Sequence, residues 1–351
     1  MSDDTRYRPL AELTIARAKE FAREPEALFW VFFFPVLLAV ALGLAFRDKG
    51  PDKIPVGVVA ASEADAVAAR TAKVLASSPL LLPRPYSAAA GREALRTGRI
   101  SLLVEPGPAT TFRFDETRPD SRIARLEADE ALQRAAGRKD PVAVRAEKVT
   151  EKGGRYIDFL VPGLLGMNLM GSGIWSLAFS VTTARTKRVL KRLVATPMRK
   201  SHYLLAQVLG RLAFLIPEVV ILIGSGWLFF GVAVRGSLLL LALASLLGAM
   251  TFCGLGLLIA SRVSTIEGAS GIANLVMMPM WLLSGVFFSS ERFPDAVQPY
   301  IKALPLTALN QALRGIITEG HSLIAVAPQL AIVLAWGLVS FAVALKIFRW
   351  R

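Results

Sequence analysis

Six apolar runs constrain this sequence more than any other feature, because each is long enough to cross a lipid bilayer. A helix of about 20 mainly apolar residues spans the hydrocarbon core. Since that core offers no water to unpaired backbone groups, runs of this kind must form helices. The predicted spans are residues 27–46, 157–181, 204–230, 238–260, 269–288 and 323–348.

The charged residues are segregated between these runs. With 54% hydrophobic and 19% charged residues, the chain is too apolar for a soluble enzyme and too charged to lie wholly inside a membrane. A net charge of +14 is also typical of nucleic-acid-binding proteins, but these carry a basic face on a soluble fold. We therefore expect the lipid bilayer, and no nucleic acid, among the partners of the chain.

The loop at residues 182–203 sets the orientation of the predicted spans. It carries seven Lys and Arg residues and no Asp or Glu. Short loops with such an excess of cations stay on the cytoplasmic side of the membrane. We predict a multi-pass protein of the bacterial inner (plasma) membrane with both termini in the cytoplasm, where residues 1–26 contain an interfacial helix.

Two segments between the spans are not simple loops. Residues 47–156 alternate strand-like and helix-like patterns, which indicates a small α/β domain. A loop this long is exempt from the positive-inside rule, so its cations are compatible with an extracytoplasmic location. Residues 289–322 are semi-polar and rich in proline, and we predict that they re-enter the membrane or lie in its outer interface. The predicted fold is an α-helical polytopic membrane protein with six transmembrane helices and a small α/β extracytoplasmic domain inserted between the first and second.

The sequence carries no motif of an enzyme. The phosphate-binding pattern GxxxxGK followed by Ser or Thr is missing, so any ATP must be handled by a partner. His202 and His321 are far apart and have no matching Cys, which argues against a metal site. We expect neither catalytic residues nor a cofactor in this chain.

Three short motifs follow one another in a fixed order. They are YIDFLVPGLLGM at 156–167, LVATP at 193–197 followed by Arg199 and Lys200, and Leu304-Pro305 before the last span. In these motifs, and in the order of its elements over essentially its whole length, the chain resembles the permease subunit of type-2 bacterial ATP-binding-cassette exporters. Residues 184–192 depart from that family, whose members commonly carry acidic residues and a Gly-Thr pair there.

The resemblance implies a partner and a direction of transport. It implies a homodimer or heterodimer of permeases joined to a cytoplasmic ABC ATPase subunit, which would bind ATP and Mg. It also implies export of a substrate, which we expect to be hydrophobic or amphipathic, such as a drug or a lipid. Drugs, lipids, glycans and lipopeptides all remain compatible with the sequence.

The basic loop contains the predicted ATPase-coupling helix. An element that transmits movement from a soluble partner must dock on that partner and connect directly to a span. An apolar stripe flanked by cations fits this task, and Pro197 would end the helix before the third span. The alternative is an amphipathic helix held by anionic lipid headgroups. The predicted coupling residues are Arg185, Lys187, Val189, Leu190, Leu193, Val194 and Pro197.

Two groups of residues inside the spans are candidates for a role in transport. Arg211 and Glu218 lie seven positions apart in the third span, and charges inside a membrane are costly unless they pair or function. Their mutual pairing and a contact of Glu218 with substrate are both open. Met277 and Trp281 belong to an apolar cluster in the fifth span that suits either a greasy substrate or helix packing.

Two other classes of protein remain as alternatives. An integral-membrane enzyme that modifies lipids would need Asp, His or Ser residues converging at one membrane face, and no such cluster is evident in the sequence. A membrane sensor with an extracytoplasmic ligand domain would need a cytoplasmic output domain, and none of the cytoplasmic segments is long enough.

Overall fold

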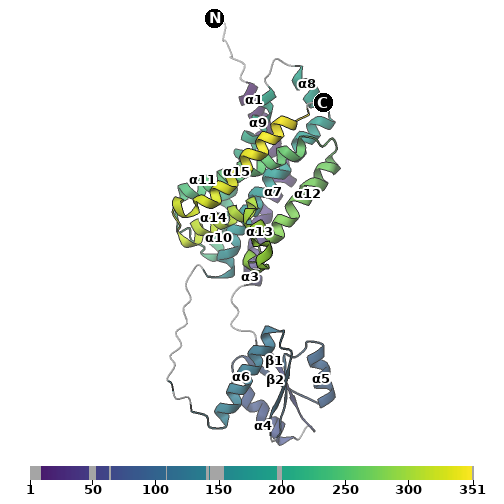
Figure 1. Cartoon of the computed structure of the whole chain (residues 1–351), viewed down its shortest axis with the longest axis vertical. Coiled ribbons are helices and arrows are strands. Elements are labelled where there is room, and N and C mark those ends of the chain that lie inside the picture. Colours follow the sequence, from purple (N-terminus) through teal and green to yellow (C-terminus); the bar gives the residue numbers. More distant parts are fainter. Residues whose placement is uncertain are drawn as a thin grey trace. The chain divides into compact units, whose positions relative to one another are not determined.

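The computed structural model of the chain describes residues 9–46, 53–62, 65–107, 109–139, 142, 154–195 and 200–349. The chain divides into two compact units (Figure 1). Residues 1–47 and 150–351 form one unit, here called the membrane unit, and residues 48–149 form the other, here called the α/β unit.

The described part of the membrane unit contains six helical stretches that are long and apolar enough to cross a bilayer. This confirms the prediction of a predominantly helical protein with six candidate spans. In chain order the stretches comprise α2 (Pro25–Leu28) with η1 (Phe29–Phe33) and α3 (Phe34–Ala45), α7 (Tyr156–Thr186), α9 (Lys200–Leu212) with α10 (Leu215–Phe230), α11 (Leu238–Ala260), α12 (Ile266–Leu283) and α15 (Leu323–Ile347).

The core of the membrane unit is built around α7. This helix packs against α3, α10, α11 and α12, and most of its side chains are buried. Its contact with α11 depends on glycine, because a Cβ atom at Gly256 would lie 2.7 Å from the backbone oxygen of Ile174. A Cβ atom at Gly173 would likewise lie 2.9 Å from the Cβ of Phe252. Small residues thus allow the two backbones to approach closely, as they do in many membrane helix pairs.

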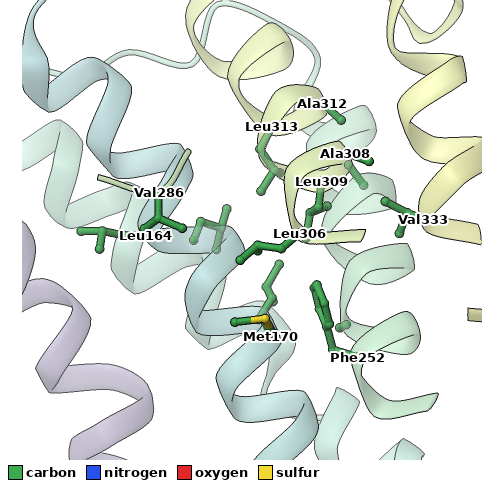
Figure 2. Close-up of a cluster of buried hydrophobic side chains, with 14 of the residues drawn as sticks. Leu164, Met170, Phe252, Val286, Leu306, Ala308, Leu309, Ala312, Leu313 and Val333 are labelled. Carbon is green, nitrogen blue, oxygen red and sulfur yellow. The ribbon is translucent and has the colours of Figure 1, made fainter. Parts of the chain in front are cut away.

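The segment before the last span contains a helix that packs into this core. It contains η2 (Ser290–Arg292), η3 (Asp295–Val297), α13 (Gln298–Ala303), α14 (Pro305–Arg314) and the π-helix η4 (Gly315–Glu319). Leu306 and Leu309 of α14 are completely buried. Figure 2 shows them among side chains of α7, α11 and α15, including Leu164, Met170, Phe252 and Val333. α14 is therefore a packed element of the bundle.

The third span is two helices, where the apolar run predicted one. α9 ends at Leu212 and α10 begins at Leu215. The cause lies in Pro217, which has no N–H to donate to the carbonyl of Ala213 four residues earlier. The chain turns at Ala213 and Phe214, and helical hydrogen bonding resumes when Glu218 N–H donates to the Phe214 carbonyl.

The first helix, α1 (Pro9–Ala22), packs along α9. Phe21 is buried, and its ring lies 4.5 Å from that of Phe214. The stem of Arg17 crosses α9 at Gly210, where a Cβ atom would meet the Cγ of Arg17 at 2.7 Å. In Figure 1, α1 lies at the same end of the membrane unit as α8 (Val189–Val194).

The α/β unit is a four-stranded sheet with the strand order β2-β1-β3-β4. β1 pairs in parallel with β2 and β3, and β3 pairs antiparallel with β4. The elements are β1 (Ile54–Val59), α4 (Ala66–Leu75), β2 (Leu81–Tyr86), α5 (Ala88–Arg96), β3 (Leu102–Glu105), β4 (Thr111–Phe114) and α6 (Pro119–Ala135). The structure thus shows an α/β fold for the inserted segment.

Successive side chains of a strand point to opposite faces of the sheet, and helices cover both faces. Val56 and Val58 pack with α4 and α6 on one face, whereas Leu103 packs with α5 on the other. Asp65 caps α4 by accepting hydrogen bonds from the first turn. The backbone N–H groups of Ala61, Ala68 and Val67 lower the pKa of the Asp65 carboxyl.

We predict that Gly256→Ala destabilises the membrane unit, because the new methyl group would press on the backbone of Ile174. Overpacking of this kind costs about 1–3 kcal/mol. The matched control is Gly224→Ala, since no atom lies within 4 Å of a Cβ added at Gly224. Thermal unfolding of the purified proteins in micelles measures the melting temperatures of both variants. Equal melting temperatures for the two variants would contradict the close α7–α11 packing.

Candidate functional site

A cavity of about 1030 Å³ lies in the membrane unit between the first span, α7 and α12. Its volume is at the upper end of the range typical of small-molecule sites. Its wall is mainly apolar and rich in aromatic rings, and we call it the aromatic cavity. The rings that line it are Trp30, Phe34, Trp175, Phe179, Trp281 and Phe287.

One wall of the aromatic cavity takes its shape from a proline. Pro35 has no N–H, so the carbonyl of Val31 loses its ordinary helical donor. The chain forms the π-helix η1 just before Pro35, and the side-chain amide of Asn168 on α7 donates to the Val31 carbonyl at 2.9 Å. This bond ties the first span to α7 beside the cavity, and π-helical turns are frequent at functional sites.

The three predicted substrate-path residues do not all reach the cavity. Met277 and Trp281 line it. Glu218 lies behind the wall, where its Oε1 accepts a hydrogen bond of 3.1 Å from the hydroxyl of Ser172. Ser172 itself lines the cavity. A hydrogen bond to Ser172 therefore connects Glu218 to the cavity wall.

Arg211 and Glu218 form an ion pair across the break in the third span. Their side chains are 1% and 0% exposed. Arg211 also donates to the hydroxyl of Ser172, so one hydroxyl of α7 contacts both charges. Because Arg211 belongs to α9 and Glu218 to α10, the pair joins the two halves of the broken span and ties both to the cavity wall.

Sequence reasoning missed most of the residues that line the cavity. Trp30 and Phe34 are four residues apart, as are Trp175 and Phe179, which places each pair on one helical face. The rings of Trp175 and Phe179 stack with 4.7 Å between their centroids. The spacing of four residues predicts from sequence that each pair shares a helical face. It does not predict that the two pairs face the same cavity.

One apolar side chain of the predicted coupling helix, Leu190, is buried within the protein itself. The loop after α7 forms the short helix α8 (Val189–Val194), which begins after a left-handed residue at Arg188. Leu190 is 1% exposed and packs into a cluster with Tyr203 and Leu204 of α9. Leu190 therefore attaches α8 to the bundle.

The cations of this loop differ in their surroundings. Arg185 donates to the carbonyl of Ala260 at 2.7 Å and to that of Arg349 at 2.9 Å, and it also contacts the carbonyls of Ser261 and Val263. A cation at the carbonyl end of a helix, here α11, is electrostatically favoured. The side chains of Lys187, Arg188, Lys191 and Arg192 are exposed. Arg185 thus anchors the loop, and the other four form its outer surface.

For two of the predicted coupling residues the structure describes no side chain. Pro197 lies outside the described residues. Val194 is the last residue of α8, and its side chain is likewise outside the description. Val189 is 38% exposed and Leu193 is half-buried.

Comparison with known proteins gives one family. A family model described as ABC-2 family transporter protein matches residues 25–346. The inner membrane transport permease YadH of Escherichia coli K12 is 28% identical over 159 residues, which are 45% of this chain and 62% of YadH. The linearmycin resistance permease protein LnrN of Bacillus subtilis 168 is 28% identical over 175 residues, 49% of this chain and 44% of LnrN.

A third relative is the probable multidrug ABC transporter permease YbhS of Escherichia coli K12. It is 26% identical over 171 residues, which are 46% of this chain and 44% of YbhS. The matched regions thus cover about half of this chain and between 44% and 62% of the three relatives.

We predict that Glu218→Leu strongly destabilises the membrane unit, because it leaves Arg211 as an unpaired buried charge. Breaking a buried pair from one side costs about 3–5 kcal/mol. The double variant Arg211→Met with Glu218→Leu removes both charges and is expected to recover most of this loss. Denaturant unfolding in micelles measures the stability of the two single variants and the double variant, with Glu291→Leu, which changes an exposed residue of η2, as control. A double variant as unstable as Glu218→Leu would contradict the pairing.

Proposed function

Since the chain belongs to the ABC-2 family of transporter proteins, we propose that it is the membrane-spanning permease subunit of an ATP-driven exporter. Its substrate is hydrophobic or amphipathic, such as a drug or a lipid, and leaves the cytoplasm or the inner leaflet. A separate cytoplasmic ABC ATPase subunit supplies the energy, and the permease works as a homodimer or heterodimer in the bacterial plasma membrane. Both termini lie in the cytoplasm and the α/β unit lies outside it.

The observation that carries this proposal is the aromatic cavity. A cavity of about 1030 Å³ bordered by three candidate spans provides room for a drug-sized molecule at membrane depth. Its aromatic lining offers large apolar contact areas without fixed hydrogen-bond geometry. Such a wall favours apolar molecules of varied shape. The names of two relatives, a probable multidrug ABC transporter permease and a linearmycin resistance permease, support the same substrate range.

A chain of direct contacts supports coupling between this cavity and a cytoplasmic ATPase. The buried Leu190 joins α8 to α9, and α9 carries Arg211. Arg211 contacts Glu218 and Ser172, and Ser172 lines the cavity. A displacement of α8 by a partner would therefore pass along α9 to the break in the third span and reach the cavity wall.

Different residues of the proposed coupling segment have different roles. It comprises Arg185, Lys187, Val189, Leu190, Leu193, Val194 and Pro197. Arg185 and Leu190 hold the segment to the bundle, as their contacts with α11 and α9 indicate. The exposed cations, including Lys187, present a basic surface that an acidic patch of the ATPase would recognise.

We predict that Lys191→Glu combined with Arg192→Glu weakens assembly with the ATPase by about tenfold or more, because it reverses two exposed charges without touching the core. Co-purification of the ATPase and its stimulated hydrolysis rate are the measurements. Lys302→Glu in α13 reverses an exposed charge elsewhere and serves as control. Unchanged assembly and hydrolysis in the charge-reversed protein would show that this surface does not dock the ATPase.

We predict that Trp281→Ala reduces transport of apolar substrates in vesicles that contain the permease and its ATPase. Loss of one large buried ring contact corresponds to about a tenfold weaker apparent affinity. Trp227→Ala is the matched control, since Trp227 is 63% exposed on α10 and lies outside the cavity lining. If the two variants transported a panel of lipophilic dyes equally well, the aromatic cavity would not be the path.

A further inference from the structure

A second cavity, of about 660 Å³, continues the aromatic cavity toward α8. It lies between α1, α7 and α9, and the two cavities share six lining residues, among them Ser172, Trp175 and Phe179. These shared residues make the two cavities neighbours, so an elongated molecule that passes them would contact both. We call the second space the polar cavity.

The wall of the polar cavity carries hydrogen-bonding side chains that the folded chain has buried. Gln207, Tyr203 and Arg17 are only 8%, 4% and 9% exposed. The hydroxyl of Ser180 donates to the Oε1 of Gln207 at 2.9 Å. Arg17 donates to the backbone and hydroxyl oxygens of Ser176, each at 3.3 Å. Buried polar groups are costly unless they are bonded, and the side chains of this wall are bonded within the chain. The lining of the aromatic cavity has fewer such groups, namely Asn168 and Ser172, beside its six rings.

The charges around the polar cavity balance. Its lining contains two cations, Arg17 and Lys187, and two acids, Glu20 and Glu24. Arg17 and Glu20 form an ion pair at 2.7 Å. A charged ligand group would lose hydration free energy on entering this cavity. No excess of opposite charge is present to compensate that loss. A group with hydroxyls or amides and no net charge can instead bond to Ser176, Ser180, Gln207 and Thr183.

Taken together, the two cavities have the polarity of an amphiphile. We propose that the polar cavity is a headgroup site, and that the substrate is an amphiphile whose head carries hydroxyl or amide groups and no net charge, with its tail in the aromatic cavity. The inference rests on the proposed function and narrows its substrate class. It also gives α1 a role, since this helix forms one wall of the head site.

The test uses the full chain in lipid nanodiscs and three probes with the same brominated alkyl tail. One is a monoacylglycerol, with an uncharged hydroxyl-bearing head, the second is the fatty acid, and the third is the alkyltrimethylammonium. Bromine quenches tryptophan fluorescence on contact, and the part of the quenching lost in Trp281→Phe reports the tail in the aromatic cavity. The expected result is that the monoacylglycerol binds several-fold more tightly than the two charged probes.

The variant Gln207→Leu with Ser180→Ala removes a bonded pair of the head site together. It is expected to weaken monoacylglycerol binding about threefold to tenfold and to leave the charged probes unchanged, since each hydrogen bond contributes about 0.5–1.5 kcal/mol. Thr183→Val is a second variant of similar shape, in case the double variant folds poorly. Ser225→Ala on α10, which lies outside the lining of both cavities, is the control.

Two contrary outcomes separate the inference from the proposed function. If all three probes bind equally in a Trp281-dependent manner and neither head-site variant changes their affinity, the headgroup site is overturned and the aromatic cavity stands. If no probe gives Trp281-dependent quenching, the aromatic cavity does not bind amphiphiles, and both the inference and the proposed path fail.

Discussion

Backbone carbonyls at the ends and breaks of the spans need new hydrogen-bond donors, and side chains of α7 supply them. Inside a membrane an unpaired carbonyl costs several kcal/mol, so such donors are obligatory. Arg155, which caps α7, donates to the Phe230 carbonyl at the end of α10, at 2.9 Å. Asn168 in its middle donates to Val31 opposite Pro35, and Arg185 at its end donates to Ala260 at the end of α11. Three neighbouring spans are thus placed by polar side chains of one helix.

The same constraint links the cavity mechanically to α9 and α8. Asn168 fixes the π-helical turn of the first span, which brings Trp30 and Phe34 to the cavity. On the same helix Ser172 contacts the ion pair that bridges the break in the third span. Since a broken helix lacks continuous backbone bonding, the stiffness of this joint depends on the pair. Movement of α9 therefore reaches the cavity through polar contacts with defined partners.

Much of the fold was predictable from the sequence, because hydropathy and helical periodicity are local properties. The six spans and the α/β character of the insert follow from such patterns. The break at Ala213 and Phe214 also had a local signal in Pro217, which a reading of hydropathy alone overlooks. By contrast, Leu190 has the pattern of a docking residue, and only the tertiary contact with α9 shows that it is buried within the chain.

The candidate site was less predictable, since it is assembled from residues distant in the sequence. Arg185 is one of seven similar cations in its loop, and only the nearby carbonyls distinguish it from Lys187. Asn168 is a lone polar residue in an apolar run, and its role depends on a proline in another span. Met277 and Trp281, which their adaptable apolar character makes candidates, line the cavity, whereas Glu218 lies behind it.

In the proposed function, ATP-driven movement at the cytoplasmic surface changes access to the aromatic cavity. Gly171→Cys places a thiol in this cavity without a clash, because the added Cβ lies 3.8 Å from the Cε of Met277, and the native Cys253 is buried. The measurement is the rate at which a membrane-impermeant thiol reagent labels this cysteine from each side of vesicles that contain the permease and its ATPase. The account predicts that ATP slows labelling from the cytoplasmic side and accelerates it from the other side. Labelling rates that are the same with and without ATP on both sides would contradict it.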